Sequence, residues 1–261
     1  MSNIARRQVV RALAAAPLAG LPLATVLADP RLARAAAAGL EEVWLTTQGG
    51  KAVTAALAMP AVHPAPAVLL VHEWWGLNDQ IKSVAAALAE QGYIALAVDL
   101  YDGKIATQPD QAQSLMQAVK DPVAADTLKT WVTWLRTHKD ATGKIGTVGW
   151  CFGGGWSLNA SIASPVDATV IYYGRVNQPA DELAALKGPV LGHFATRDGW
   201  IDKNMVDGFR SAMAAAGKHL EAHWYEADHA FANPTQARYD AEDAMLAWAR
   251  TLAFFKTHLM T

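Results

Sequence analysis

Residues 145–155 of this chain read IGTVGWCFGGG, a short apolar run followed by glycines placed around the only cysteine, Cys151. The apolar run predicts a strand, and the residues after the cysteine predict a helix. Gly149 and Gly153 lie two positions on either side of Cys151, which relieves crowding where the chain reverses direction. Such a turn places the thiol at a helix N-terminus, where the dipole favours an anion. The pattern predicts a cysteine nucleophile, although a buried cysteine that packs as a small hydrophobe is an alternative.

Apolar runs alternate with amphipathic stretches from Glu41 onward. We expect strands over 43–47, 53–59, 68–72, 94–98, 144–148, 168–173, 190–195 and 220–225. We expect helices over 83–91, 122–138, 152–163, 204–216 and 236–259. The pair Gly49-Gly50 predicts a hairpin between the first two strands, which we expect to be antiparallel edge strands. The alternation predicts an α/β fold with a mostly parallel, twisted sheet and helices on both faces.

Length and composition indicate one enzyme-sized domain. The chain has 261 residues, of which 52% are hydrophobic and 18% are charged. The formal net charge is −2, and no basic stripe occurs, so we expect no nucleic-acid partner. Ten tryptophans are present, and they suit either the core or an aromatic pocket wall.

The N-terminus differs in composition from the rest of the chain. Residues 5–11 read ARRQVVR, which resembles a twin-arginine export signal through Arg6 and Arg7. The apolar stretch over 12–28 is too short and too weakly apolar for a membrane span, so we expect no stable membrane insertion. We therefore expect residues 1–38 to direct export, with a periplasmic location.

Two further expectations concern this boundary. Small-residue cleavage options lie at 33–35 and 36–38, and the mature domain is expected over 39–261. The alternative for the same segment is an alanine-rich helix that caps the domain.

A single cysteine allows no intrachain disulfide, and we expect a monomer or a weak homo-oligomer.

Four side chains that could take part in catalysis follow predicted strands. Glu73 follows the strand over 68–72, Cys151 the strand over 144–148, Asp198 the strand over 190–195, and His229 the strand over 220–225. The carboxyl ends of parallel strands meet at one edge of a sheet, where ligands bind. Taken singly, Asp198 could be a turn aspartate and His229 could cap the last helix. Together they follow the chain order nucleophile, acid, histidine.

Several short motifs together resemble the dienelactone hydrolase family of α/β-hydrolases. The matching segments are HEWWGLN at 72–78, DLY at 99–101, GWCFGG at 149–154, Asp198 and DHAF at 228–231. The resemblance covers roughly residues 41–260. It implies an α/β-hydrolase fold and the cleavage of a small carboxylic ester or lactone through a cysteine acyl-enzyme, with no cofactor.

The resemblance also implies a role for each matching residue. Cys151 is the nucleophile, His229 the base, and Asp198 the residue that orients the imidazole. Glu73 is implied to interact with the resting thiol until substrate displaces it. The backbone N–H groups of Phe152 and Trp74 are implied to form the oxyanion hole.

The chain departs from the family where its dienelactone-cleaving members hold a substrate carboxylate with basic residues. Ala230 and Asn233 stand where those members have Ser and Arg, and Lys104 or Arg175 are the candidate substitutes. We therefore expect a substrate without that carboxylate. The aromatic candidates for the pocket wall are Trp74, Trp75, Tyr101 and Trp200, and core packing is the alternative for each.

Other chemistries find little support in the sequence. No C-x-x-C spacing occurs, and the run of glycines after Cys151 is explained by the turn, so we expect no metal and no phosphate loop. A redox role for Cys151 lacks a resolving cysteine. The alternative to an enzyme is a non-catalytic ligand-binding protein on the same scaffold.

Overall fold

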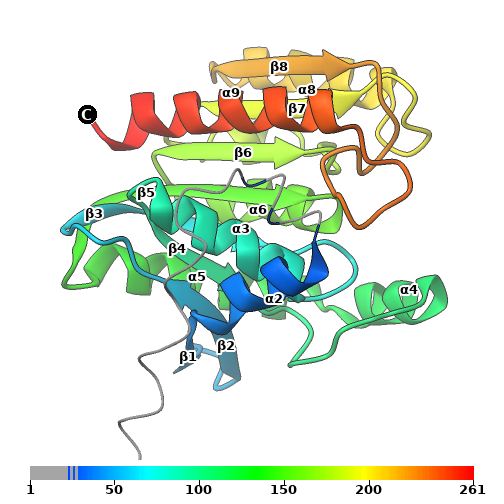
Figure 1. Cartoon of the computed structure of the whole chain (residues 1–261). Coiled ribbons are helices and arrows are strands. Elements are labelled where there is room, and N and C mark those ends of the chain that lie inside the picture. Colours follow the sequence, from blue (N-terminus) through cyan, green and yellow to red (C-terminus); the bar gives the residue numbers. More distant parts are fainter. Residues whose placement is uncertain (1–22, 24–25, 27–28) are drawn as a thin grey trace, which may run out of the picture.

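The strands of the computed structural model, which describes residues 23, 26 and 29–261, form a single sheet (Figure 1). They are β1 (Glu41–Thr46), β2 (Ala52–Ala58), β3 (Ala65–Val71), β4 (Ile94–Val98), β5 (Ala141–Trp150), β6 (Ala168–Tyr172), β7 (Val190–Ala195) and β8 (Leu220–Tyr225). Their order across the sheet is β1-β2-β4-β3-β5-β6-β7-β8. The β1–β2 and β2–β4 pairs are antiparallel, and every later pair is parallel.

Helices cover both faces of this sheet. They are α2 (Pro30–Ala38), α3 (Asp79–Glu90), α4 (Pro109–Ala118), α5 (Asp121–Thr137), α6 (Phe152–Ala163), α7 (Ala180–Leu183), α8 (Lys203–Ala215) and α9 (Ala241–Leu259). In β3, Val68 and Leu70 pack with α3 and α9, whereas Leu69 and Val71 pack with α5 and α6. Alternate residues of a buried strand point to opposite faces, which explains why β3 is an unbroken apolar run. The predicted α/β class is confirmed.

The sequence pattern located most elements but misplaced several ends. α6, β4, β7 and β8 match their predicted bounds. β5 extends past its predicted end because its pairing with β6 continues to Trp150 opposite Tyr172. α3 begins four residues before its predicted start because the Asn78 side chain caps it by accepting a hydrogen bond from the Ile81 N–H. α9 begins at Ala241, after a turn that ends at its cap Asp240, and not at residue 236.

One expectation about an element was wrong, and two helices were not predicted. β2 was expected at the edge of the sheet, but it pairs with β1 on one side and with β4 on the other. The short helices α4 and α7 were not predicted, because neither shows a long amphipathic period. The hairpin between β1 and β2 forms as expected, and Gly50 has a positive φ of 81° in its turn.

Part of the predicted export segment packs on the domain. Arg6 and Arg7 lie outside the described residues. In α2, Ala33 and Ala37 are buried, and the Ala33 carbonyl accepts a hydrogen bond of 2.8 Å from Ser83 Oγ on α3. This packing is what the alternative of a capping helix expects.

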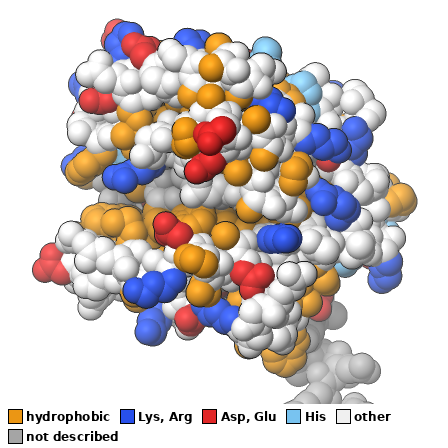
Figure 2. Space-filling view, turned by 180° about the vertical axis from the view of Figure 1, so that it is seen from behind, with side chains coloured by type: hydrophobic (Ala, Val, Ile, Leu, Met, Phe, Trp, Pro, Cys, Tyr) orange, Lys and Arg blue, Asp and Glu red, His pale blue; other side chains and the backbone are white. Residues whose placement is uncertain are grey.

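The surface carries charges of both signs. Figure 2 shows Lys and Arg side chains interspersed with Asp and Glu over the face opposite to that of Figure 1. Among the described residues, no helix combines the length and the apolar character needed to span a membrane.

Candidate active site

Cys151 occupies a strained turn, here called the elbow (residues 149–153), between β5 and α6. Its φ is 53° and its ψ is −116°, in a region that non-glycine residues rarely adopt. A Cβ at Gly149 would lie 1.9 Å from the Gly153 carbonyl oxygen, and a Cβ at Gly153 would lie 2.2 Å from the Val71 carbonyl oxygen. Only glycine fits both positions. The Cys151 N–H donates to the Tyr172 carbonyl at 3.0 Å, which fixes the turn to β6.

Asp198 and His229 are hydrogen-bonded to each other. His229 Nδ1 lies 2.6 Å from Asp198 Oδ2, and the other carboxylate oxygen accepts the N–H groups of Trp200 at 2.8 Å and Ile201 at 3.0 Å. Burial alone raises the pKa of Asp198, but its hydrogen bonds and the His229 charge lower it below its usual value. Asp198 is therefore a fixed anion that holds one ring nitrogen of His229.

His229 also lies close enough to Cys151 for the two side chains to influence each other's charge. Burial disfavours the imidazolium form, but the hydrogen bond to Asp198 and the charges of Cys151 and Asp198 outweigh it. The pKa of His229 rises to about 10 as a result. An imidazole held this way readily keeps a proton taken from a thiol.

Glu73 is buried beside this group, with 3% of its surface exposed. In the described part of the chain, its carboxylate accepts hydrogen bonds from Tyr173 Oη at 3.3 Å and from the Asn233 side-chain amide, and not from Cys151. Burial raises the pKa of Glu73, and these two bonds together with the charge of His229 offset part of that rise. Glu73 is therefore held by a pair of fixed donors, and its implied interaction with the resting thiol stays a prediction.

Tyr173 was missed by the sequence reasoning. It follows β6 directly, is fully buried, and its ring centroid lies 5.1 Å from that of His229. Burial and the charges of Glu73 and Cys151 raise its pKa well above the usual value, so the phenol stays neutral and donates. Its place at the carboxyl end of a parallel strand was the available signal.

Asn233 faces the protein and not an open pocket. Only 1% of its surface is exposed, and its Oδ1 accepts from the Thr235 N–H at 3.0 Å and from Thr235 Oγ1 at 2.7 Å. With its amide on Glu73, both ends of the side chain are engaged. Asn233 therefore sets the surroundings of Glu73.

The backbone N–H groups of Phe152 and Trp74 are the two predicted oxyanion donors. Within residues 29–261, neither the Phe152 N–H nor the Trp74 N–H donates to another group of the protein. Phe152 is the first residue of α6, so its N–H has no partner within the helix. Both groups are available to an oxygen atom.

The predicted wall residues differ in exposure. Trp200 is 62% exposed, with its ring centroid 5.0 Å from that of His229 and the Arg238 guanidinium 5.4 Å from the indole centroid. Tyr101 is buried, and its Oη has no hydrogen-bond partner among the described residues. Burial and the nearby Cys151 raise its pKa. Trp75 is partly buried, and its carbonyl accepts the Ala106 N–H at 2.9 Å.

The two candidate cations for a substrate carboxylate are exposed, and neither is brought to the reacting group by a contact in the structure. Lys104 lines two cavities near the carboxyl end of β4, and Cys151 lines neither of them. Arg175 lies beside Gly155 in α6.

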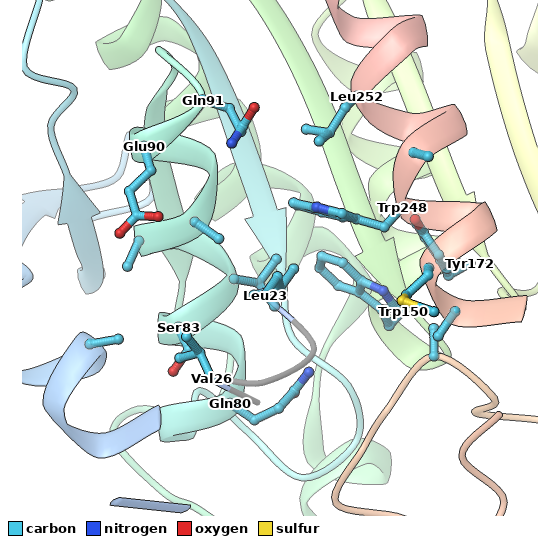
Figure 3. Close-up of a pocket in the computed structure, with 18 of the residues that line it drawn as sticks. Leu23, Val26, Gln80, Ser83, Glu90, Gln91, Trp150, Tyr172, Trp248 and Leu252 are labelled. Carbon is cyan, nitrogen blue, oxygen red and sulfur yellow. The ribbon is translucent and has the colours of Figure 1, made fainter. Parts of the chain in front are cut away.

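A cavity of about 490 Å³ lies between α3 and α9 (Figure 3). Trp150 and Trp248 point into it, and Leu23 and Val26 of the N-terminal segment line it. None of Cys151, Asp198, His229 and Glu73 lines this cavity, so it is not the place where these groups meet.

Comparisons with known proteins agree with the geometry. The model of the dienelactone hydrolase family matches residues 53–259. A Saccharolobus solfataricus protein, named provisionally as a carboxymethylenebutenolidase, is 33% identical over 254 residues, which cover 83% of this chain and 98% of that protein. The carboxymethylenebutenolidase of Pseudomonas putida is 29% identical, over 82% of this chain and 95% of its own.

A solved structure agrees as well. A crystal structure from Klebsiella pneumoniae, named provisionally as a dienelactone hydrolase, superposes with a TM-score of 0.74 at 29% identity. The superposition covers 83% of this chain and 97% of that one. The likeness therefore extends over nearly the whole of both α/β-hydrolase domains.

Proposed function

The chain belongs to the dienelactone hydrolase family, and from this membership we propose that it hydrolyses a small carboxylic ester or lactone through a cysteine acyl-enzyme. The observation that carries the proposal is the linked set of Cys151, His229 and Asp198 at the carboxyl ends of three strands. A thiol at a helix N-terminus, beside an oriented imidazole, is the arrangement needed for nucleophilic attack.

The proposed first half-reaction forms a thioester. His229 takes the proton of the Cys151 thiol, and the sulfur attacks the carbonyl carbon of the ester. The carbonyl oxygen becomes an oxyanion that the N–H groups of Phe152 and Trp74 can bind. When the carbon–oxygen bond breaks, the leaving alkoxide takes the proton from His229 and departs as an alcohol.

The proposed second half-reaction releases the acid. His229 removes a proton from water, the resulting hydroxide attacks the thioester carbonyl, and the same two N–H groups bind the oxyanion again. The sulfur leaves and recovers its proton from His229. Asp198 keeps the imidazole in one tautomer throughout.

Glu73 is proposed to influence the charge of the His229 imidazole. Its carboxylate lies close enough to His229 for their charges to interact, so a charged Glu73 favours the imidazolium. The family implies that the carboxylate moves against the resting thiol and away from it. In this chain Tyr173 and Asn233 oppose such movement because they bind both carboxylate oxygens.

The proposed substrate lacks a free carboxylate near the reacting carbonyl. Asn233, in the place of a basic residue, is engaged by Glu73 and Thr235. A neutral ester or lactone needs no cation at that position. We further propose that the protein acts outside the cytoplasm, in the periplasm, because of the Arg6-Arg7 pair.

The test is intact-mass spectrometry after brief mixing with a panel of activated esters and lactones. We expect a mass increase equal to one acyl group in the wild type and none in Cys151→Ala. The variant should lose at least about 10³-fold in kcat/KM because the covalent route is gone. Ester turnover by Cys151→Ala at the wild-type rate contradicts the proposal. An absence of both turnover and acyl-enzyme over the whole panel favours a non-catalytic binding protein.

A further inference from the structure

His72 is a buried titratable residue to which the proposed mechanism gives no task. It follows β3 directly, precedes Glu73, and has no exposed surface. Its side chain makes two hydrogen bonds, both to backbone groups of the site. Nδ1 lies 2.6 Å from the Glu73 carbonyl oxygen, and Nε2 lies 3.1 Å from the Leu100 backbone nitrogen.

These two partners determine the tautomer. The Leu100 N–H can only donate, so Nε2 must be the acceptor and carry no proton. The Glu73 carbonyl can only accept, so Nδ1 must carry the proton and donate it. Burial lowers the pKa of His72, which keeps the ring neutral, although the bond to Glu73 and the charge of Asp99 oppose that shift.

The Glu73 carbonyl belongs to the same peptide group as the Trp74 N–H. This peptide is trans, so its C=O and N–H point in opposite directions. The carbonyl accepts hydrogen bonds from His72 Nδ1 and from the Gly76 N–H at 3.2 Å, so the Trp74 N–H is directed to the opposite edge of the peptide. A hydrogen bond to the carbonyl also polarises the peptide and strengthens its N–H as a donor.

His72 also links this peptide to the other segments of the site. Its ring centroid lies 4.6 Å from that of Tyr101 and 5.9 Å from that of Phe152. A Cβ at Gly153 would lie 2.4 Å from the His72 carbonyl oxygen, so the elbow packs directly on the His72 backbone. One side chain therefore contacts the segments that carry both proposed oxyanion donors.

We propose that His72 is a positioning residue that orients the Glu73–Trp74 peptide so that the Trp74 N–H serves the oxyanion hole. This inference rests on the proposed acyl-transfer function. His72 touches no reacting atom, and it acts through the peptide that it holds. Leu100, bonded to Nε2, fixes the imidazole in turn.

The experiment compares two reactions of the only cysteine in the full chain. Hydrolysis of p-nitrophenyl acetate needs the oxyanion hole, whereas alkylation of Cys151 by iodoacetamide is a displacement at a saturated carbon that forms no oxyanion. His72→Leu removes both hydrogen bonds. His72→Gln is the matched control, because its amide can donate to the Glu73 carbonyl and accept from Leu100.

We expect His72→Leu to lower kcat for the ester by about 10- to 100-fold, since a misdirected donor is less costly than a deleted one. KM and the alkylation rate should each change by less than about 3-fold. His72→Gln should recover most of kcat. Unchanged ester turnover in His72→Leu overturns the inference, and so does an equal loss of alkylation, which indicates a general effect on the thiol.

A measurement on the wild type covers the case in which His72→Leu does not fold. The ¹⁵N shifts of the His72 ring should show a neutral imidazole with its proton on Nδ1. A proton on Nε2 overturns the inference. Failure of the wild type to hydrolyse any ester contradicts the proposed function instead, and the two failures are thus distinguished.

Discussion

The side-chain amide of Asn233 donates a hydrogen bond to the carboxylate of Glu73, from a position 160 residues further along the chain. From the sequence, Asn233 marks the loss of a cation for a substrate carboxylate. In the structure it is buried and serves a carboxylate of the protein itself. The residue therefore influences the charge of Glu73, and through it that of His229.

Removal of this donor should make Glu73 harder to ionise. The Asn233 hydrogen bond lowers the pKa of Glu73, against a larger rise caused by burial. In Asn233→Leu the pKa should therefore rise further. The check is ¹³C NMR of labelled glutamate carboxyls across a pH titration. Thr235→Val is the control, because it removes one donor to Asn233 Oδ1 but keeps the bond to Glu73. Equal titration in wild type and Asn233→Leu contradicts the prediction.

Asp198 and Glu73 should affect stability with opposite dependence on pH. The folded-state pKa of Asp198 lies below its ordinary value of 3.8, so its stabilising effect is present above that pH and lost as the pH falls. The folded-state pKa of Glu73 lies above 4.5, so ionisation costs the folded state more as the pH rises from there.

The measurement is the free energy of unfolding in urea between pH 3 and pH 7. Asp198→Asn should be less stable than the wild type at neutral pH by about 1.5–3 kcal/mol, as for a hydrogen bond to a charged group, and the gap should narrow as the pH falls below 3.8. The free energy of unfolding of Glu73→Gln should increase relative to that of the wild type as the pH rises above 4.5. The prediction is contradicted if the free energy of unfolding of Asp198→Asn or of Glu73→Gln depends on pH in the same way as that of the wild type.

The sequence predicted most of this fold because buried parallel strands are apolar runs separated by helices. β4, β7 and β8 could be located to the residue, since each is bounded by turns and carries its own pattern. Cys151, Asp198 and His229 were found because each lies just after such a strand, where parallel strands bring side chains to one edge. Local signals were sufficient for this part of the site.

The partners of Glu73 could not be found in the same way. Tyr173 is 100 residues from Glu73 and Asn233 is 160 residues from it. Contacts at such separations depend on how loops fold over the sheet edge, and the hydrophobic periodicity of the sequence does not indicate them. For the same reason Asn233 suggests only a missing cation from the sequence, while its hydrogen bonds in the structure give it a different task.

Trp200 should affect substrate binding more than chemistry. It packs edge-on to His229 and is mostly exposed, so it forms part of the rim beside the base. Trp200→Ala should raise KM by about 3- to 30-fold with a smaller change in kcat, as expected for binding that is similar in ground and transition states. Trp44→Ala is the control, because Trp44 is 76% exposed on β1, away from these groups. A larger fall in kcat than rise in KM contradicts this role.

The Arg6-Arg7 pair should be required for export. Twin-arginine signals depend on both arginines, so replacing both with lysine should hold the protein in the cytoplasm. The check is fractionation of cells that express the wild type and the double variant. Unchanged export excludes the twin-arginine route and leaves other routes open.

Substrates without a carboxylate should be preferred. A charge-assisted hydrogen bond to a substrate carboxylate is worth roughly 1.5–3 kcal/mol, or about 10- to 100-fold in kcat/KM. Asn233 cannot supply it, because its amide and its oxygen are both engaged within the protein. The measurement is the ratio of kcat/KM for an ester that carries a free carboxylate to that for its methylated analogue. We expect the methylated analogue to be favoured.

A clear preference for the acid contradicts this prediction and requires another cation near the reacting group. Lys104 follows the DLY segment, and Arg238 lies over the Trp200 ring, which in turn contacts His229. Lys104→Met and Arg238→Met separate the two, because only the variant that lacks the responsible cation should lose the preference for the acid. If both variants keep that preference, the basic residue that binds the carboxylate is neither of these, and Arg175 is the remaining candidate from the sequence.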